Sequence, residues 1–178
     1  HLIPEDFTVD FAARHPNGSS TISCREEDVV PEPPIVTNSC GDTIAAHGPI
    51  QFLPNNYCNS YSSYMFTYED CAGHRVGWGY TYTIKDTIAP TFTIPDTTFI
   101  CRNTNGTVES DTSSTGVPTD VTDNCTSHIL QISYSDIVTN HISSTDTIWR
   151  TWTVMDSCYN SSSQTQIIII NPPVYVFL

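Results

Sequence analysis

Seven cysteines are the residues of this sequence whose type and spacing point most directly to chemistry. None lies in a C-x-x-C pair or beside histidines at the spacing of a zinc site, so the sequence favours disulfides over metal binding. Disulfides persist outside the cell or in a periplasm, which predicts an exported protein. The seven are Cys24, Cys40, Cys58, Cys71, Cys101, Cys125 and Cys158.

Asparagines in N-x-S/T triplets offer a second kind of chemistry, the attachment of N-linked sugar. All of them fall in predicted turns or at loop edges, where an enzyme could reach them, although such triplets also arise by chance in a chain rich in Asn, Ser and Thr. They are Asn17, Asn105, Asn124 and Asn160. We therefore expect covalent glycans.

Catalytic motifs are missing from the sequence: there is no G-x-S-x-G elbow, H-E-x-x-H pair, phosphate loop or EF-hand loop. Asp120, Asp123 and Asp136 could gather around Ca²⁺ at one end of a sandwich, although turn capping by aspartate is the favoured interpretation. We predict a non-enzymatic protein with no catalytic residue, no metal site and no cofactor. The histidines expected on loops are His47, His74, His128 and His141.

Charge and hydrophobicity narrow the possible partners. Asp and Glu number 19 against 6 Lys and Arg, and the resulting net charge of -13 would repel nucleic acid and anionic lipid. No apolar run reaches about 18 residues, so no membrane span is predicted, and His1 is interpreted as a processed or truncated start. The 9 Tyr, 7 Phe and 3 Trp suffice to fill two cores.

Short alternating runs dominate the chain and predict β-strands. In 76–84 every second residue is bulky and apolar, and shorter runs at 64–68, 130–134 and 149–155 repeat this period. The continuous run Ile167 to Ile170 is expected to be a strand covered on both faces. Turn clusters separate these runs, as in a β-sandwich.

An internal duplication divides the chain into two copies when the segment from Phe7 is laid over that from Phe92. The match sets Cys24 against Cys101, Cys40 against Cys125 and Cys71 against Cys158. We predict an all-β protein of two tandem immunoglobulin-like sandwiches, residues 1–87 and 88–172, followed by a terminal strand at 173–178.

Three motifs of the second copy carry a family resemblance: V-T-D-N-C at 121–125, Y-S-D at 134–136 and W-R-T-W-T-V-M-D-S-C-Y-N at 149–160. They resemble HYR-like (hyalin-repeat-like) immunoglobulin modules of secreted repeat proteins, especially of Bacteroidota. The first copy resembles a four-cysteine variant. The resemblance implies a spacer, an adhesive stalk or a surface scaffold. Tyr159 departs from it, because family members usually have Gly there.

The resemblance and the matched copies imply disulfides from Cys40 to Cys71 and from Cys125 to Cys158, with Cys24 to Cys58 as an extra bond of the first copy. Cys101 is left over, either buried and inert or bonded to another molecule.

The D-T-I triplets resemble the O-glycosylation signal of Bacteroidota, which would modify Thr43, Thr87 and Thr147. An equally supported alternative is that Asp-Thr starts a turn and Ile returns to the sheet.

The last residues favour self-association. Val174, Tyr175, Val176, Phe177 and Leu178 form an apolar, β-prone strand that needs a partner. We expect a secreted or cell-surface structural protein, a glycosylated homopolymer assembled head to tail by β-strand addition. The alternatives are a fragment of a longer repeat array and an adhesive or carbohydrate-binding module. The latter would expose Tyr57, Tyr61 and Tyr64, for which a core position is the favoured interpretation.

Overall fold

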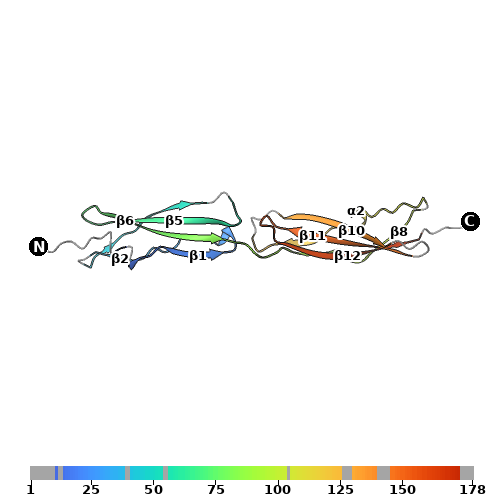
Figure 1. Ribbon diagram of the computed structural model, residues 1–178, viewed down its shortest axis with the longest axis horizontal. Helices are drawn as coiled ribbons and strands as arrows, with labels where there is room; N and C mark the ends of the chain where they lie inside the picture. Colours follow the sequence, from blue (N-terminus) through green and yellow to red (C-terminus); the bar gives the residue numbers. More distant parts are fainter. Residues whose placement is uncertain are drawn as a thin grey trace, which may run out of the picture. The chain divides into compact units, whose positions relative to one another are not determined.

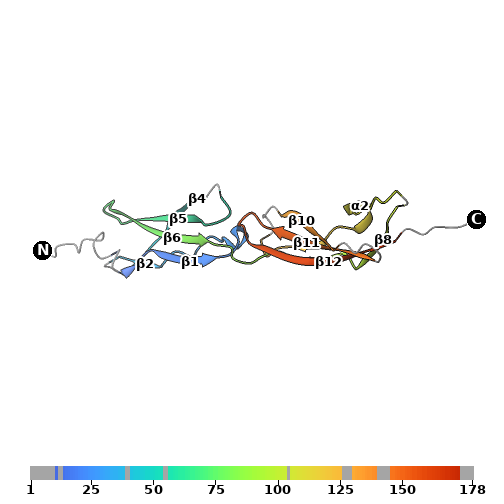
Figure 2. The ribbon, with the colours of Figure 1, turned by 45° about the vertical axis from the view of Figure 1, so that its right-hand side comes forward.

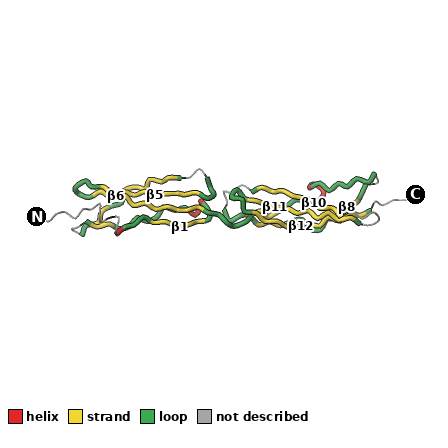
Figure 3. The backbone as a smooth tube through the Cα atoms, viewed as in Figure 1, coloured by secondary structure: helices red, strands yellow, loops and turns green. Residues whose placement is uncertain are grey.

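The chain folds into two compact units, residues 1–86 and 87–178. The computed structural model describes residues 11, 14–38, 41–53, 56–103, 105–125, 130–139 and 145–172. Cys40, His128, His141 and the segment Val174 to Leu178 lie outside the described residues. Both units are nearly all β, as Figure 3 shows, which confirms the predicted fold class of immunoglobulin-like sandwiches with disulfides.

The first unit contains one large and one small sheet (Figure 1). The large sheet has the order β1-β6-β5-β4, and β2 pairs with β3 in the small one. The elements of the first unit are β1 (Gly18–Ile22), η1 (Arg25–Glu27), β2 (Val36–Thr37), β3 (Thr43–Ile44), β4 (His47–Phe52), β5 (Ser60–Glu69) and β6 (Arg75–Ile84). His47, expected on a loop, begins a strand instead.

Alternate residues of β5 and β6 build the core of the first unit, because successive side chains of a strand point to opposite faces. They pack with Phe11 and Val36, which come from outside the large sheet. The core residues of the two strands are Tyr64, Phe66, Tyr68, Trp78 and Tyr82.

The second unit repeats this arrangement (Figures 1 and 2). Its large sheet has the order β10-β11-β12-β8, and β7 pairs with β9. Its elements are β7 (Thr91–Thr93), β8 (Thr98–Cys101), α2 (Thr112–Thr115), β9 (Thr119–Thr122), β10 (Gln131–Thr139), β11 (Asp146–Met155) and β12 (Ser161–Asn171). In both large sheets, one edge strand pairs in parallel with its neighbour and the other strands pair antiparallel. The duplication seen in the sequence is therefore also a duplication of topology.

Two small clusters form the core of the second unit. Phe92, Trp152 and Val154 form one, and Ile148, Ile168 and Ile170 form the other. Ile167 and Ile169 are only half-buried, so β12 is not covered equally on both faces as expected. The reason is that only the side facing the core meets a second layer. None of the described helices is long and apolar enough to cross a membrane.

Candidate functional site

Among the six cysteines that the structure describes, four are joined in two disulfides and two are free thiols. Cys24 and Cys58 of the first unit are bonded, as are Cys125 and Cys158 of the second. These are the four cysteines that the predicted bonds from Cys24 to Cys58 and from Cys125 to Cys158 require. Among the described cysteines, Cys71 and Cys101 are free and exposed.

The free thiol of Cys71 corrects the predicted bond to Cys40. The hairpin turns after β5 and β11 have the same hydrogen bonds: Asp70 and Asp156 each open a five-residue turn that ends at His74 and Asn160. This correspondence sets Cys71 against Ser157, not against Cys158. The sequence alignment that matched Cys71 to Cys158 was therefore wrong by one residue at this turn. The disulfide of Cys158 in the second unit thus gives no reason to expect one at Cys71.

A similar shift explains the exposure of Cys101. Ile22 pairs with Ile84 at the end of β6, and Ile100 pairs with Ile170 at the equivalent place in β12. Cys24 follows Ile22 by two residues, whereas Cys101 follows Ile100 by one. A one-residue shift moves a side chain to the other face of a sheet, and Cys101 is exposed where Cys24 is buried. The interpretation of Cys101 as a buried thiol was therefore wrong.

The candidate N-glycosylation sites differ in accessibility. Asn105 is exposed, and its Oδ1 accepts hydrogen bonds from the backbone N–H and the hydroxyl of Thr107, at 3.0 and 2.7 Å. The amide of Asn160 is half-buried and donates to Asp156 at 2.8 Å. Asn124 is exposed, and its amide donates to the sulfur of Cys125 at 3.1 Å. Asn17 is exposed, and its Oδ1 accepts from Gly79 at 2.8 Å. Asn105 is thus an exposed candidate whose side-chain oxygen is hydrogen-bonded to the threonine of its own N-x-T triplet.

The candidate O-glycosylation threonines also differ. Thr43 and Thr87 are exposed. Thr147 is half-buried in β11, between its partners Thr139 and Ile169 on the two neighbouring strands. Its neighbour Asp146 is buried in an ion pair with Arg102. Thr43 and Thr87 are therefore the better placed of the three.

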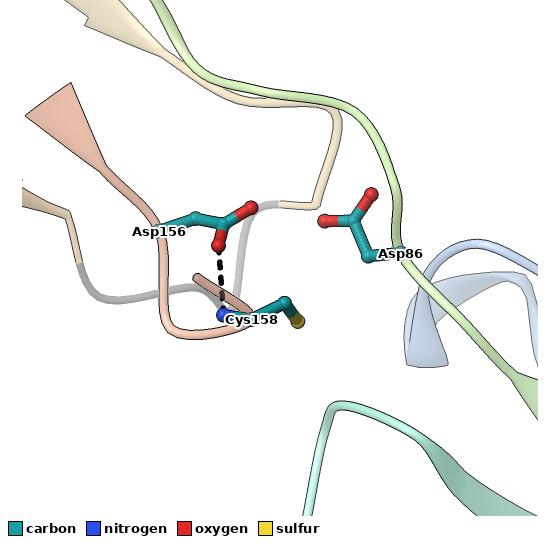
Figure 4. A group of neighbouring side chains, drawn as sticks. All are labelled: Asp86, Asp156 and Cys158. Carbon is teal, nitrogen blue, oxygen red and sulfur yellow. Dashed lines mark hydrogen bonds between the residues drawn. The ribbon is translucent and has the colours of Figure 1, made fainter. Parts of the chain in front are cut away.

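Carboxylates near the disulfides serve as turn caps. Figure 4 shows Asp156 with the backbone N–H of Cys158, which donates to Asp156 Oδ1 at 2.7 Å. Asp123 caps Cys125 in the same way at 2.9 Å. Both cysteines are in disulfides, and a disulfide sulfur is not the thiolate that binds metals. Figure 4 also draws Asp86, the last residue of the first unit, which is buried.

Asp136, one of the three aspartates considered for Ca²⁺, forms an ion pair instead. Asp136 pairs with the guanidinium of Arg150, whose Nε and Nη2 donate to its two oxygens at 2.9 and 2.8 Å. Arg150 is 1% exposed and also donates to Thr115 Oγ1 and to the carbonyl of Ser110. Sequence reasoning missed this buried arginine. The alternation in β11 could have indicated this burial, because Arg150 lies on the same face of the strand as the buried Ile148 and Trp152.

The three tyrosines nominated for binding separate in the structure. Tyr64 belongs to the core and accepts a hydrogen bond from Gln51 at 2.6 Å, while burial and the nearby Asp28 carboxylate raise the pKa of Tyr64 to about 12. Tyr57 and Tyr61 are exposed, and the guanidinium of Arg25 lies 5.0 Å from the centre of the Tyr57 ring. The expected core position holds for Tyr64 alone.

One edge strand stands out as an open surface. β10 lies at the end of its sheet, and all nine of its residues are exposed. Ile132, Tyr134, Ile137 and Val138 place large apolar groups on this strand. An exposed edge strand of this kind is a ready template for another strand.

Comparison with known proteins agrees with this architecture. Residues 12–84 match the model of the family described as HYR-like domain with 4 cysteines. The matched range covers most of the first unit and contains Cys24, Cys40, Cys58 and Cys71. No curated protein matches the chain. The match and the disulfides indicate a repeat module of the extracellular, adhesion type.

Proposed function

We propose that this chain is a non-enzymatic structural subunit of an extracellular or cell-surface filament, joined to further copies head to tail by β-strand addition. The observation that carries the proposal is the open edge of β10, whose exposed residues include four large apolar side chains. Added strands bind such edges through main-chain hydrogen bonds. A contact between two different surfaces of one chain repeats without closing and yields a fibre.

Disulfides and sugar suit this role. Each unit contains bonded cysteines, and a bond that closes a loop of about 30 residues stabilises a fold by about 3–4 kcal/mol in the chain-entropy model. We propose glycans on the exposed Asn105, Thr43 and Thr87. Peptide mapping of the native protein by mass spectrometry tests this, and sugar on Asn160 or Thr147 with none on the exposed residues would contradict it.

Electron microscopy of the purified native chain tests the assembly. We expect regular fibres, and we expect deletion of Val174 to Leu178 to leave monomers with an unchanged melting temperature. The described core residues of both units lie elsewhere in the sequence, so loss of this segment should not unfold the chain. A native chain that stays monomeric at every concentration would refute the filament. A deletion variant that forms unchanged fibres would refute strand addition by this segment.

The second candidate is an adhesive module that binds carbohydrate or a partner protein. It is favoured by Phe52 and Tyr61, which project from one face of the large sheet of the first unit, opposite Ser63 and Thr83 on adjacent strands. Exposed aromatic rings with hydroxyl groups beside them suit sugar rings. Monomers without fibres, together with sugar binding that Tyr61→Ala abolishes, would favour this candidate over a filament.

A further inference from the structure

The core-facing row of β10 is left uncovered. Residues paired across two strands lie on the same face of a sheet, and Ile132, Tyr134 and Val138 of β10 pair with Val154, Trp152 and Ile148 of β11. The three residues of β11 are 0, 2 and 3% exposed, but their partners on β10 are 45, 48 and 47% exposed. These three residues of β10 thus face the core side of the sandwich. The described part of the second unit covers their partners on β11 but leaves the β10 residues exposed.

The equivalent edge strand of the first unit, β4, is protected against the addition of another strand. β4 has six residues, contains Pro49, and shifts its register against β5 between His47 and Ile50. Proline and bulges are ordinary means of protecting a sheet edge. β10 has nine residues, no proline and an unbroken register with β11 from Gln131 to Thr139. Of the two equivalent edges, only that of β10 is shaped to accept another strand.

We propose that β10 accepts Val174 to Leu178 of a second copy as an added strand, an inference that rests on the proposed assembly and names its contact. The added strand continues the sheet beyond β10 and covers Ile132, Tyr134 and Val138. Alternate residues of a strand face opposite sides. Val174, Val176 and Leu178 therefore present one apolar row, and Tyr175 and Phe177 present another.

Charge supports this pairing. Two copies that each carry a net charge of -13 repel one another, so they approach most easily through uncharged surfaces. The donated segment has no charged side chain. β10 has one, Asp136, and Arg150 neutralises it within the same unit.

The whole segment Val174 to Leu178 cannot form a strand beside β10 of its own chain. Thr139, the last residue of β10, pairs with Thr147, which pairs with Ile169, so β12 has already passed the end of β10 when it stops at Asn171. A strand beside β10 would lie three strand spacings from β12, about 14 Å. The three residue steps from Asn171 to Val174 span at most about 11 Å. An added strand that uses all of Val174 to Leu178 therefore comes from a second copy.

A complementation experiment tests the contact in the full chain. Ile132→Lys places a charge in the accepting row, and Val176→Lys places one in the donated strand. We expect each variant alone to need at least about tenfold more protein to assemble, equivalent to about 1.4 kcal/mol. An equimolar mixture retains one intact donor and one intact acceptor, so it should form discrete dimers. Phe99→Lys, an exposed position on the opposite edge strand β8, should assemble normally.

Hydrogen exchange of the unmodified chain gives a readout that does not depend on how the variants fold. Assembly should slow amide exchange in β10 at least about tenfold and leave β4 unchanged. If the chain assembles while β10 exchanges as in the monomer, or while both lysine variants assemble normally, this contact is refuted and filament formation stands. If the unmodified chain does not assemble, the proposed function fails with it.

Discussion

Tyr159 adopts a backbone conformation that suits glycine. Its φ is +69°, and the equivalent position of the first unit is Gly73, with a φ of +85°. A residue with a Cβ atom loses about 1–2 kcal/mol in this left-handed region. Tyr159 is 81% exposed, so packing returns little of that cost. The strain is therefore local to the turn between β11 and β12.

Replacing Tyr159 by glycine should raise the free energy of unfolding of the second unit by about 0.5–1 kcal/mol, because relief of the strain exceeds the extra chain entropy of glycine. Calorimetric melting checks this. The reciprocal control is Gly73→Ala, which should lower the stability of the first unit, since an added Cβ there meets open space and only the backbone resists. A lower melting temperature for Tyr159→Gly would show that the tyrosine side chain stabilises the turn.

Two ion pairs between an arginine and a carboxylate link adjacent strands, and the two pairs differ in burial. Arg150 and Asp136 link β11 to β10, with the arginine 1% and the aspartate 25% exposed as side chains. Arg75 and Glu69 link β6 to β5, with side chains 73% and 41% exposed. Leaving one charge of a buried pair alone is costly, whereas an exposed pair contributes about 0–1 kcal/mol. The buried arginine thus helps to hold the open edge strand in place.

Asp136→Asn should lower the free energy of unfolding by about 2 kcal/mol. This loss is smaller than that expected for a fully buried ion pair, because the Asp136 carboxylate is partly exposed to solvent. Glu69→Gln, the matched control, should cost less than about 1 kcal/mol. Urea unfolding measures both. Faster amide exchange in β10 should accompany the first substitution, because Asp136 then no longer anchors that strand. Equal losses from the two substitutions would contradict the distinction between buried and exposed pairs.

At the scale of the whole molecule, each unit has its own core and its own four-stranded sheet. The aromatic cluster around Tyr68 serves the first unit, and those around Val154 and Ile168 serve the second. A domain with its own core can in principle fold alone. The bonded cysteines add covalent support within each unit.

Residues 1–86 and 87–178, produced separately under oxidising conditions, should each unfold cooperatively and show the near-ultraviolet circular dichroism of fixed aromatic side chains. Reduction should destabilise each unit by about 3 kcal/mol through the loss of its disulfide. The whole chain with its disulfides intact is the control. A unit that is unfolded alone would show that its stability depends on the other.

The sequence alone determined the strands, their inward faces and the division into two copies. Alternation of bulky and small residues in 76–84 predicted β6 (Arg75–Ile84) and placed Trp78, Tyr82 and Ile84 in the core. This worked because the pleat of a strand is a local property that every second residue reports. The predicted division near residue 87 rested on the repeated cysteine and turn segments, and the structure has compact units at residues 1–86 and 87–178.

Only the tertiary structure decided register and coverage. Cys71 and Cys158 look equivalent in the sequence, but the hydrogen bonds of their turns set them one residue apart. Ile132 and Tyr134 belong to an alternating run that predicts burial of one face, yet they and Val138 are about half exposed beside buried partners. A strand's own residues determine which way its side chains point. Whether anything covers them depends on chain segments distant in the sequence, and for β10 we propose that the covering segment belongs to another molecule.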